Sequence, residues 1–87
     1  ICMPEICRFY GIIITMFFNE HNPPHFHVRY MEHRALIDIA SGTITGTMPR
    51  RALKMIYEWL DLHQDELMDN WNRLQRGEDF KKINPLE

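Results

Sequence analysis

The sequence predicts an α+β domain in which a four-stranded, mostly antiparallel β-meander packs on a C-terminal helix or a broken helix pair. Residues 3–48 are rich in β-branched and aromatic types, which are enriched in strands. Over residues 49–76 apolar side chains recur instead at three- and four-residue steps, which is typical of a helix. The 87 residues are enough for one small domain, 1–87, whose last segment, 77–87, forms a tail.

The strand region divides at turn residues. Residues 5–18 are almost continuously apolar and form one strand, or two strands divided at Gly11. Residues 25–31 alternate cleanly between apolar and polar side chains, and residues 35–40 form the third strand. Residues 43–48 follow a Ser-Gly turn as the fourth strand.

The helical region starts at Pro49, because proline is favoured at the first position of a helix. A continuous helix over 49–76 would be about 40 Å long at 1.5 Å per residue. Such a helix is too long for so small a sheet, and we therefore expect a kink or break near residues 63–65. In the tail, Phe80 and Ile83 are expected to return the chain to the body of the domain.

The composition limits the cellular compartment and the classes of partner that we expect for this protein. No segment approaches the roughly 20 apolar residues of a transmembrane helix, and the chain lacks the basic start and cleavage site of a signal peptide. Cys2 and Cys7 cannot form a disulfide framework, so we expect a reduced, bacterial-type cytoplasm and no membrane partner. Met3 is a candidate initiator. The net charge of −2 gives no support by itself to nucleic-acid binding.

The segment 21–27 is the most informative part of the chain. It places His21, His25 and His27 around a Pro-Pro pair, which fixes two φ angles and removes two N–H donors. Histidine ligates metals and transfers protons near neutral pH, so such a cluster is a candidate site. The two prolines reverse the chain in a short span and admit a cis bond before Pro23 or before Pro24.

The expected strand register predicts which polar residues share one face of the sheet with these histidines. A turn centred on residues 32–33 pairs residues whose numbers sum to 65, which places apolar residues opposite apolar residues on the core face. This register puts His27 directly opposite Asp38, and the following turn puts Asp38 opposite Thr45. The helices cover the other face. The polar face is then predicted to hold His25, His27, Arg29, Asp38 and Thr45.

A set of short motifs spread over residues 3–86 forms a recognisable pattern. These motifs are Met3-Pro4, Arg8-Phe9, Gly11-Ile12-Ile13, the run from Asn19 to His27, Tyr30, Ala35 to Ile39, Pro49 to Ala52, Glu58-Trp59, Leu62-His63, Asp65 to Leu67 and Asn70-Trp71. In these motifs the chain resembles a family of small bacterial proteins, the domain of unknown function numbered 4160. The resemblance implies a stand-alone bacterial module, often found beside another small gene in an arrangement similar to toxin–antitoxin pairs. It implies no activity.

Three interpretations of the histidine cluster remain open. In the preferred one, the histidines are structural and hydrogen-bond the loop and the sheet. In the second, all three histidines bind a divalent metal ion such as Zn²⁺, with Asp38 as a fourth or outer ligand. In the third, His25 and His27 perform metal-free acid–base catalysis on RNA with Asp38, while Arg8 and Arg29 bind phosphate. A partner-binding surface without chemistry remains as well.

Other residues have simpler interpretations. Arg50 and Arg51, together at a helix start, are candidate binding residues for a partner or phosphate, although a solvated pair is preferred. Trp59 and Trp71 recur at helical spacing and are expected to pack in the core. Cys7 is expected to be a buried, inert thiol.

The resemblance implies a small accessory protein of the toxin–antitoxin type, and the residues predict that its histidine-bearing sheet face contacts RNA or a small protein partner. The alternative is a ribonuclease-like or metal-assisted hydrolase that uses the same face. Homo-oligomerisation is compatible with both.

Overall fold

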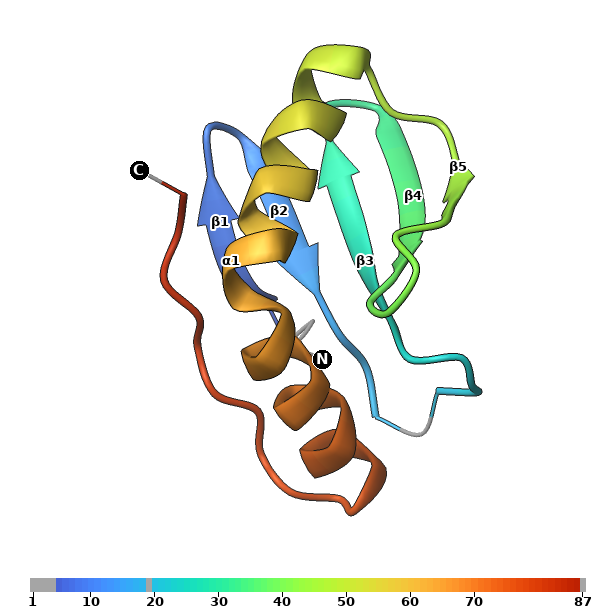
Figure 1. Ribbon diagram of the computed structural model, residues 1–87, viewed down its shortest axis with the longest axis vertical. Helices are drawn as coiled ribbons and strands as arrows, with labels where there is room; N and C mark the ends of the chain where they lie inside the picture. Colours follow the sequence, from blue (N-terminus) through green and yellow to red (C-terminus); the bar gives the residue numbers. More distant parts are fainter. Residues whose placement is uncertain (1–4, 19, 87) are drawn as a thin grey trace.

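A computed structural model describes residues 5–18 and 20–86 and forms a five-stranded antiparallel sheet followed by one long helix (Figure 1). The strands lie in the sheet in chain order. The predicted α+β meander is confirmed, and the strand count rises to five because residues 5–18 form two strands divided at Gly11. The elements are β1 (Glu5–Phe9), β2 (Ile12–Thr15), β3 (His25–Tyr30), β4 (His33–Asp38), β5 (Ile44–Gly46) and α1 (Arg50–Gln75).

The first hairpin turns at Tyr10 and Gly11, whose φ angles are 50° and 81°. Glycine adopts this left-handed region without steric cost, which explains why the apolar run breaks there. The register of β1 against β2 shifts between Glu5 and Cys7, as in a β-bulge. Ile6 and Cys7 are both buried, in agreement with the prediction of an inert Cys7 thiol.

The β3–β4 register differs from the prediction by two residues. The hairpin loop is only two residues long, and Tyr30 pairs with His33. His25 therefore lies opposite Asp38, and the predicted pairing of His27 with Asp38 is wrong. The faces are as predicted, because a shift of two residues keeps every side chain on its own side of the sheet.

The β4–β5 pairing is shifted by two residues as well. Thr45 lies opposite Leu36, so the predicted pairing of Thr45 with Asp38 is wrong. The connecting loop is longer than expected because the Asp38 carboxylate stabilises it, accepting hydrogen bonds from the backbone N–H groups of Ala40 at 2.9 Å and Ser41 at 3.1 Å. Asp38 is the last residue of β4, and its side chain stabilises the turn that follows.

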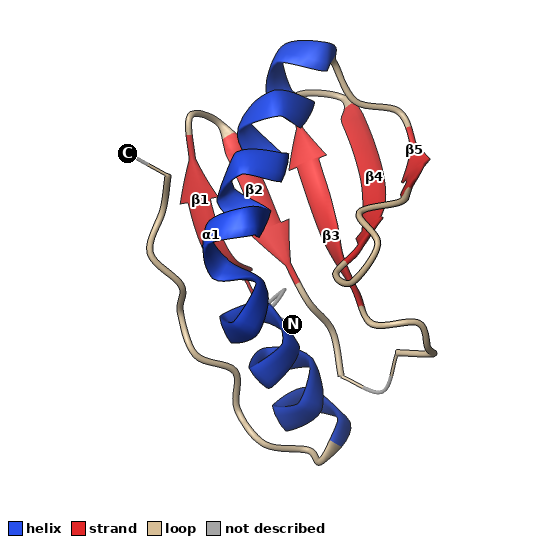
Figure 2. Cartoon of the chain, viewed as in Figure 1, coloured by secondary structure: helices blue, strands red, loops and turns tan. Residues whose placement is uncertain are grey.

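The helix α1 covers one face of the sheet, while none of residues 5–18 and 20–86 forms a helix on the other face (Figure 2). It starts one residue later than predicted, with Pro49 as its N-cap residue. The predicted kink is confirmed at His63, whose φ of −124° and ψ of 22° are not helical. In residues 5–18 and 20–86, no helix combines the length and the apolar character needed to cross a membrane.

The end of α1 is defined by Gly77, whose φ is 76°. The N–H of Gly77 donates to the carbonyl of Leu74, and the N–H of Glu78 donates to the carbonyl of Arg73. This pair of bonds is a Schellman motif, which satisfies carbonyls that the helix leaves free. The chain then turns back along the sheet.

The core lies between α1 and the sheet. Trp59 is completely buried and Trp71 is 3% exposed, which confirms their predicted role in packing. Phe26, also completely buried, meets the Trp59 ring edge-on at 6.0 Å. The tail runs back beside β1 (Figure 1), where the N–H of Ile83 donates to the carbonyl of Ile6 at 3.0 Å.

Candidate functional site

The helix-free face of the sheet carries a groove of about 620 Å³. Because paired residues of antiparallel strands project to the same side, the register determines which side chains line it. Its floor is partly apolar, formed by residues such as Ile13 and Leu36. The polar residues that line the groove are Glu5, Arg8, Thr15, His27, Arg29, Arg34 and Thr45.

Three arginines share one row across this face. Arg8 is paired with Ile13, Ile13 with Arg29, and Arg29 with Arg34. The Arg8 guanidinium forms an ion pair with Glu5 at 2.8 Å, which holds the pKa of the Glu5 carboxyl below its usual value. In the part of the chain that the structure describes, neither Arg29 nor Arg34 has an ion pair with a carboxylate.

The pair Arg29–Arg34 is electrostatically unfavourable by itself. Two like charges directly opposite each other on antiparallel strands destabilise a sheet. Both side chains are exposed on the helix-free face and line the groove. The site is thus suited to an anion that contacts both guanidinium groups.

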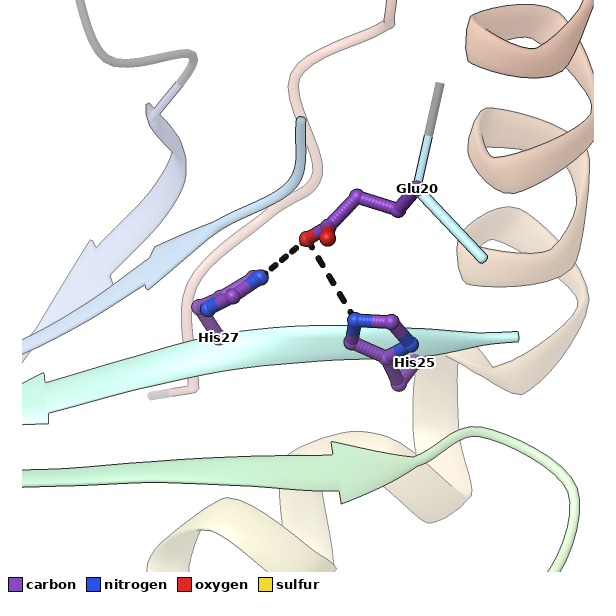
Figure 3. Close-up of side chains that lie close together, drawn as sticks. All are labelled: Glu20, His25 and His27. Carbon is purple, nitrogen blue, oxygen red and sulfur yellow. Dashed lines mark hydrogen bonds and ion pairs between the residues drawn. The ribbon is translucent and has the colours of Figure 1, made fainter. Parts of the chain in front are cut away.

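A second cluster lies where the β2–β3 loop meets the start of β3. The ligand atoms of Glu20, His25 and His27 all lie within 4.8 Å of one another. Figure 3 shows both imidazole rings directed from β3 toward the Glu20 carboxylate, which reaches them from the loop. Glu20 Oε1 accepts a hydrogen bond from Nε2 of His27 and lies 3.3 Å from Nε2 of His25.

The His25 ring has a defined orientation. Its Nδ1 donates a hydrogen bond to the carbonyl of Pro23 at 2.8 Å, so Nε2 is the nitrogen that faces Glu20. The ring also packs on Trp71 of α1, with 5.2 Å between centroids. The Asn22–Pro23 bond is cis, one of the two bonds at which the sequence admits this geometry.

Contacts with Phe17 and Gln75 fix the positions of His27 and of the loop that carries Glu20. The His27 ring meets Phe17 edge-on at 4.6 Å. The backbone carbonyl of Glu20 accepts a hydrogen bond from Nε2 of Gln75 at 2.9 Å, which ties the loop to the end of α1. Burial raises the pKa of the Glu20 carboxyl, but the hydrogen bond from His27 and the charges of both histidines outweigh burial and lower it overall.

The structure separates the residues that the sequence grouped together. His21 is exposed and does not join the cluster, and Asp38 stabilises its own turn without contacting His27. Arg50 and Arg51 are exposed at the start of α1 and do not line the groove. The predicted residues that line the groove are Arg8, His27, Arg29 and Thr45.

The sequence-based prediction missed Glu20 of the cluster, and Glu5, Thr15 and Arg34 of the groove. Glu20 lies next to the histidine segment, and a carboxylate adjacent to a cluster of imidazoles is a signal that could have identified it. Arg34 was missed because the predicted register placed it in the turn. A two-residue hairpin loop, the commonest kind, would have placed it opposite Arg29.

Comparison with known proteins identifies a family for this chain. The family described as Domain of unknown function (DUF4160) matches residues 11–72, more than half of the chain. The match extends from the β1–β2 turn to the last turns of α1, and it includes the Glu20 loop and strand β3. No curated protein and no solved structure matches the chain. The chain therefore belongs to the DUF4160 family, as the resemblance of its histidine segment predicted.

Proposed function

We propose that this protein is a small accessory module of the toxin–antitoxin type that binds a single-stranded segment of RNA in the groove of its helix-free sheet face. The observation that carries the proposal is the pair Arg29–Arg34. These two guanidinium groups face each other across β3 and β4 without a carboxylate partner among the described residues. A phosphodiester backbone supplies the anion that relieves their repulsion.

The rest of the groove supports a nucleic-acid strand as the ligand. The hydroxyl of Thr45 is available at the edge of the groove to bond a 2′-hydroxyl, the group by which proteins distinguish RNA from DNA. Apolar floor residues such as Ile13 and Leu36 offer a surface for unstacked bases. A shallow groove across a sheet suits one strand better than a duplex.

Fluorescence anisotropy with a labelled single-stranded RNA tests the proposal on the full chain. Arg29→Glu and Arg34→Glu should each weaken binding by at least about tenfold, because each removes a phosphate contact and adds a repulsive charge. DNA of the same sequence should bind more weakly. Equal binding of RNA and DNA would show that Thr45 does not distinguish the two by a hydrogen bond to the 2′-hydroxyl.

Arg50→Glu and Arg51→Glu are the matched controls, since they make the same charge change outside the groove. We expect them to retain affinity within about twofold at moderate salt, because neither side chain lines the groove and salt screens exposed charges that do not contact the RNA. Equal losses in the control and groove variants would move the binding surface to the start of α1. Absence of RNA binding by the unmodified protein would refute the proposal and favour a protein partner.

A hydrolase that acts on the bound strand is the second candidate. It is favoured by one observation: His27 lines the groove and donates a hydrogen bond to Glu20. A histidine oriented by a carboxylate is a common arrangement for proton transfer. The sequence assigned this orienting role to Asp38, whereas the geometry supports Glu20.

Cleavage and binding can be separated with one variant. If the protein is a hydrolase, Glu20→Gln should abolish cleavage of a labelled RNA while anisotropy still reports binding. Intact RNA after prolonged incubation with the unmodified protein, with and without added divalent metal, would eliminate this candidate and leave the binding function.

A further inference from the structure

We infer that Glu20, His25 and His27 form a binding site for one divalent transition-metal ion, of which Zn²⁺ is the representative. The inference does not depend on RNA binding, since it rests on a different set of side chains from the arginine pair. It also differs from the set that the sequence suggested, which used His21 and no glutamate.

The spacing of the three ligand atoms supports this site. Zinc bonds to histidine nitrogen and carboxylate oxygen are about 2.0–2.2 Å long, so neighbouring ligand atoms of a tetrahedral site lie about 3.4 Å apart. Nε2 of His25 and Oε1 of Glu20 are 3.3 Å apart. All three ligand atoms lie within 4.8 Å of one another, close enough for one ion to reach each of them after small side-chain adjustments. The ion takes the place of the Nε2 proton that His27 donates to Glu20, and this proton is released to solvent when the ion binds.

The hydrogen bond to Pro23 fixes the tautomer of the neutral His25 ring and leaves its Nε2 available. The Pro23 carbonyl can only accept a hydrogen bond, so Nδ1 of His25 carries the proton of that bond. In the neutral ring, Nε2 then presents its lone pair toward the Glu20 carboxylate. Two lone pairs facing each other at 3.3 Å repel unless a proton or a cation lies between them. Metal-binding histidines are commonly oriented by this kind of Nδ1–H bond to a backbone carbonyl.

The cluster is also held in place before any ion arrives. His25 packs on Trp71, and His27 packs on Phe17. The exposed fractions of the His25, His27 and Glu20 side chains are 14%, 30% and 27%, so the site is partly shielded and still reachable from solvent. A preorganised site loses less conformational entropy when it binds its ion.

The ligand chemistry selects the class of ion. Two imidazoles and one carboxylate suit zinc and its neighbours, whereas Mg²⁺ and Ca²⁺ prefer oxygen ligands alone. Three protein ligands leave a fourth position of a tetrahedral ion open. Because His27 also lines the groove, the cluster adjoins the groove, and a small molecule or water can occupy the open position.

The test uses full-length, untagged protein stripped with a chelator and titrated with Zn²⁺ by isothermal calorimetry. We expect one ion per chain with a Kd of about 1 μM or tighter. Co²⁺ should bind at the same site, produce visible absorption bands of a four- or five-coordinate ion and quench tryptophan fluorescence, since Trp71 packs on the His25 ring.

Glu20→Gln, His25→Gln and His27→Gln each remove a direct ligand of the ion. Each should weaken Zn²⁺ binding by at least about 10–100-fold, which is the loss typical when only a residue that orients a ligand is removed. His21→Gln is the matched control: it removes a neighbouring imidazole outside the cluster and should leave the Kd unchanged within about twofold. Thermal unfolding monitors folding of each variant. Glu20→Gln is the safest of the three because its side chain contributes no core packing.

Three results would overturn the inference. The first is failure of the unmodified protein to bind Zn²⁺ and Co²⁺ stoichiometrically. The second is unchanged affinity in the Glu20→Gln, His25→Gln and His27→Gln variants. The third is a loss of affinity in His21→Gln that matches the loss in His25→Gln, which would restore the three-histidine set in place of the set with Glu20.

Discussion

At the scale of single residues, the repulsion between Arg29 and Arg34 on the helix-free face lowers the stability of the fold, and no other contact among the described residues explains why both are present. Arg29 and Arg34 are directly opposed across β3 and β4, where an arginine and a carboxylate would be more stable. Residues that serve binding are commonly retained at some cost to stability. The repulsion between these two side chains can therefore be measured as a test of the binding role that we propose for them.

Arg34→Glu should stabilise the protein while it weakens RNA binding. The substitution replaces a like-charge pair with an opposite-charge pair, which is worth about 0.2–1 kcal/mol between cross-strand neighbours. Urea unfolding at low salt measures the change in the free energy of unfolding, and the gain should shrink at high salt. A loss of stability would show that Arg34 already has a favourable partner.

His27 and Phe26 are adjacent in β3 and project to opposite faces, so their substitution separates function from structure. Phe26→Ala should cost about 3–5 kcal/mol, because it opens a cavity in the core. His27→Ala should change the free energy of unfolding by no more than about 1 kcal/mol, since its side chain is 30% exposed. Thermal and urea unfolding check both. If His27→Ala is as destabilising as Phe26→Ala, the purely structural interpretation of the histidine is correct.

At the scale of elements, the hydrophobic pattern predicted the faces of the strands but not their partners. A strand has a side-chain period of two, so apolar residues remain opposite apolar residues after any shift of two. Val28 pairs with Ala35 in the structure instead of with Ile37, and both pairings bury apolar side chains. Only the length of the turn separates these registers. The candidate partner of His27 therefore could not be identified from the pattern alone.

The carboxylate at the cluster comes from a loop, where no periodic pattern applies. Glu20 is brought to His25 and His27 because α1 extends past the ends of the strands toward the β2–β3 loop (Figure 1). Its backbone carbonyl accepts a hydrogen bond from Gln75, 55 residues away in the sequence. This tertiary contact ties down the loop that presents Glu20 to the histidines. The contact itself has no local signal in the sequence, although the position of Glu20 beside the histidine segment does.

Gln75→Ala should weaken Zn²⁺ binding by about tenfold although Gln75 is no ligand, because it releases the loop that presents Glu20. Its free energy of unfolding should fall by less than about 1.5 kcal/mol, the usual net value of one hydrogen bond. Gln64→Ala is the matched control, since Gln64 donates a similar bond from α1 to the carbonyl of Ile39, outside the cluster. Calorimetric Kd values should separate the two variants. Equal affinity of both would show that Gln75 does not position Glu20.

At the scale of the whole molecule, the two faces of the sheet differ in what they contact. One face packs on α1 through a core that includes Trp59, and the other presents the groove. The apolar pattern predicted this division, because alternation in the strands and the helical period in α1 each define one buried side. The groove itself depends on the exact register and on the open face, which the pattern does not specify.

The groove is electropositive only locally. The protein has a net charge of −2, and the sequence therefore offered little support for nucleic-acid binding. Register concentrates Arg8, Arg29 and Arg34 in one row, and Glu5 neutralises the first of them. The charges of Arg29 and Arg34 remain, so we expect few phosphate contacts. The affinity for RNA should therefore depend only weakly on salt concentration.

The salt dependence of RNA binding tests the central claim most directly, because it counts the phosphates that named arginines contact. For single strands, the logarithm of the association constant falls with the logarithm of salt concentration with a slope of about −0.7 per contacted phosphate. Arg29→Gln and Arg34→Gln should each make this slope shallower by about 0.7, while Arg50→Gln should leave it unchanged. A slope that is the same in the unmodified protein and in both groove variants, or that changes as much in Arg50→Gln, would contradict RNA binding on the helix-free face.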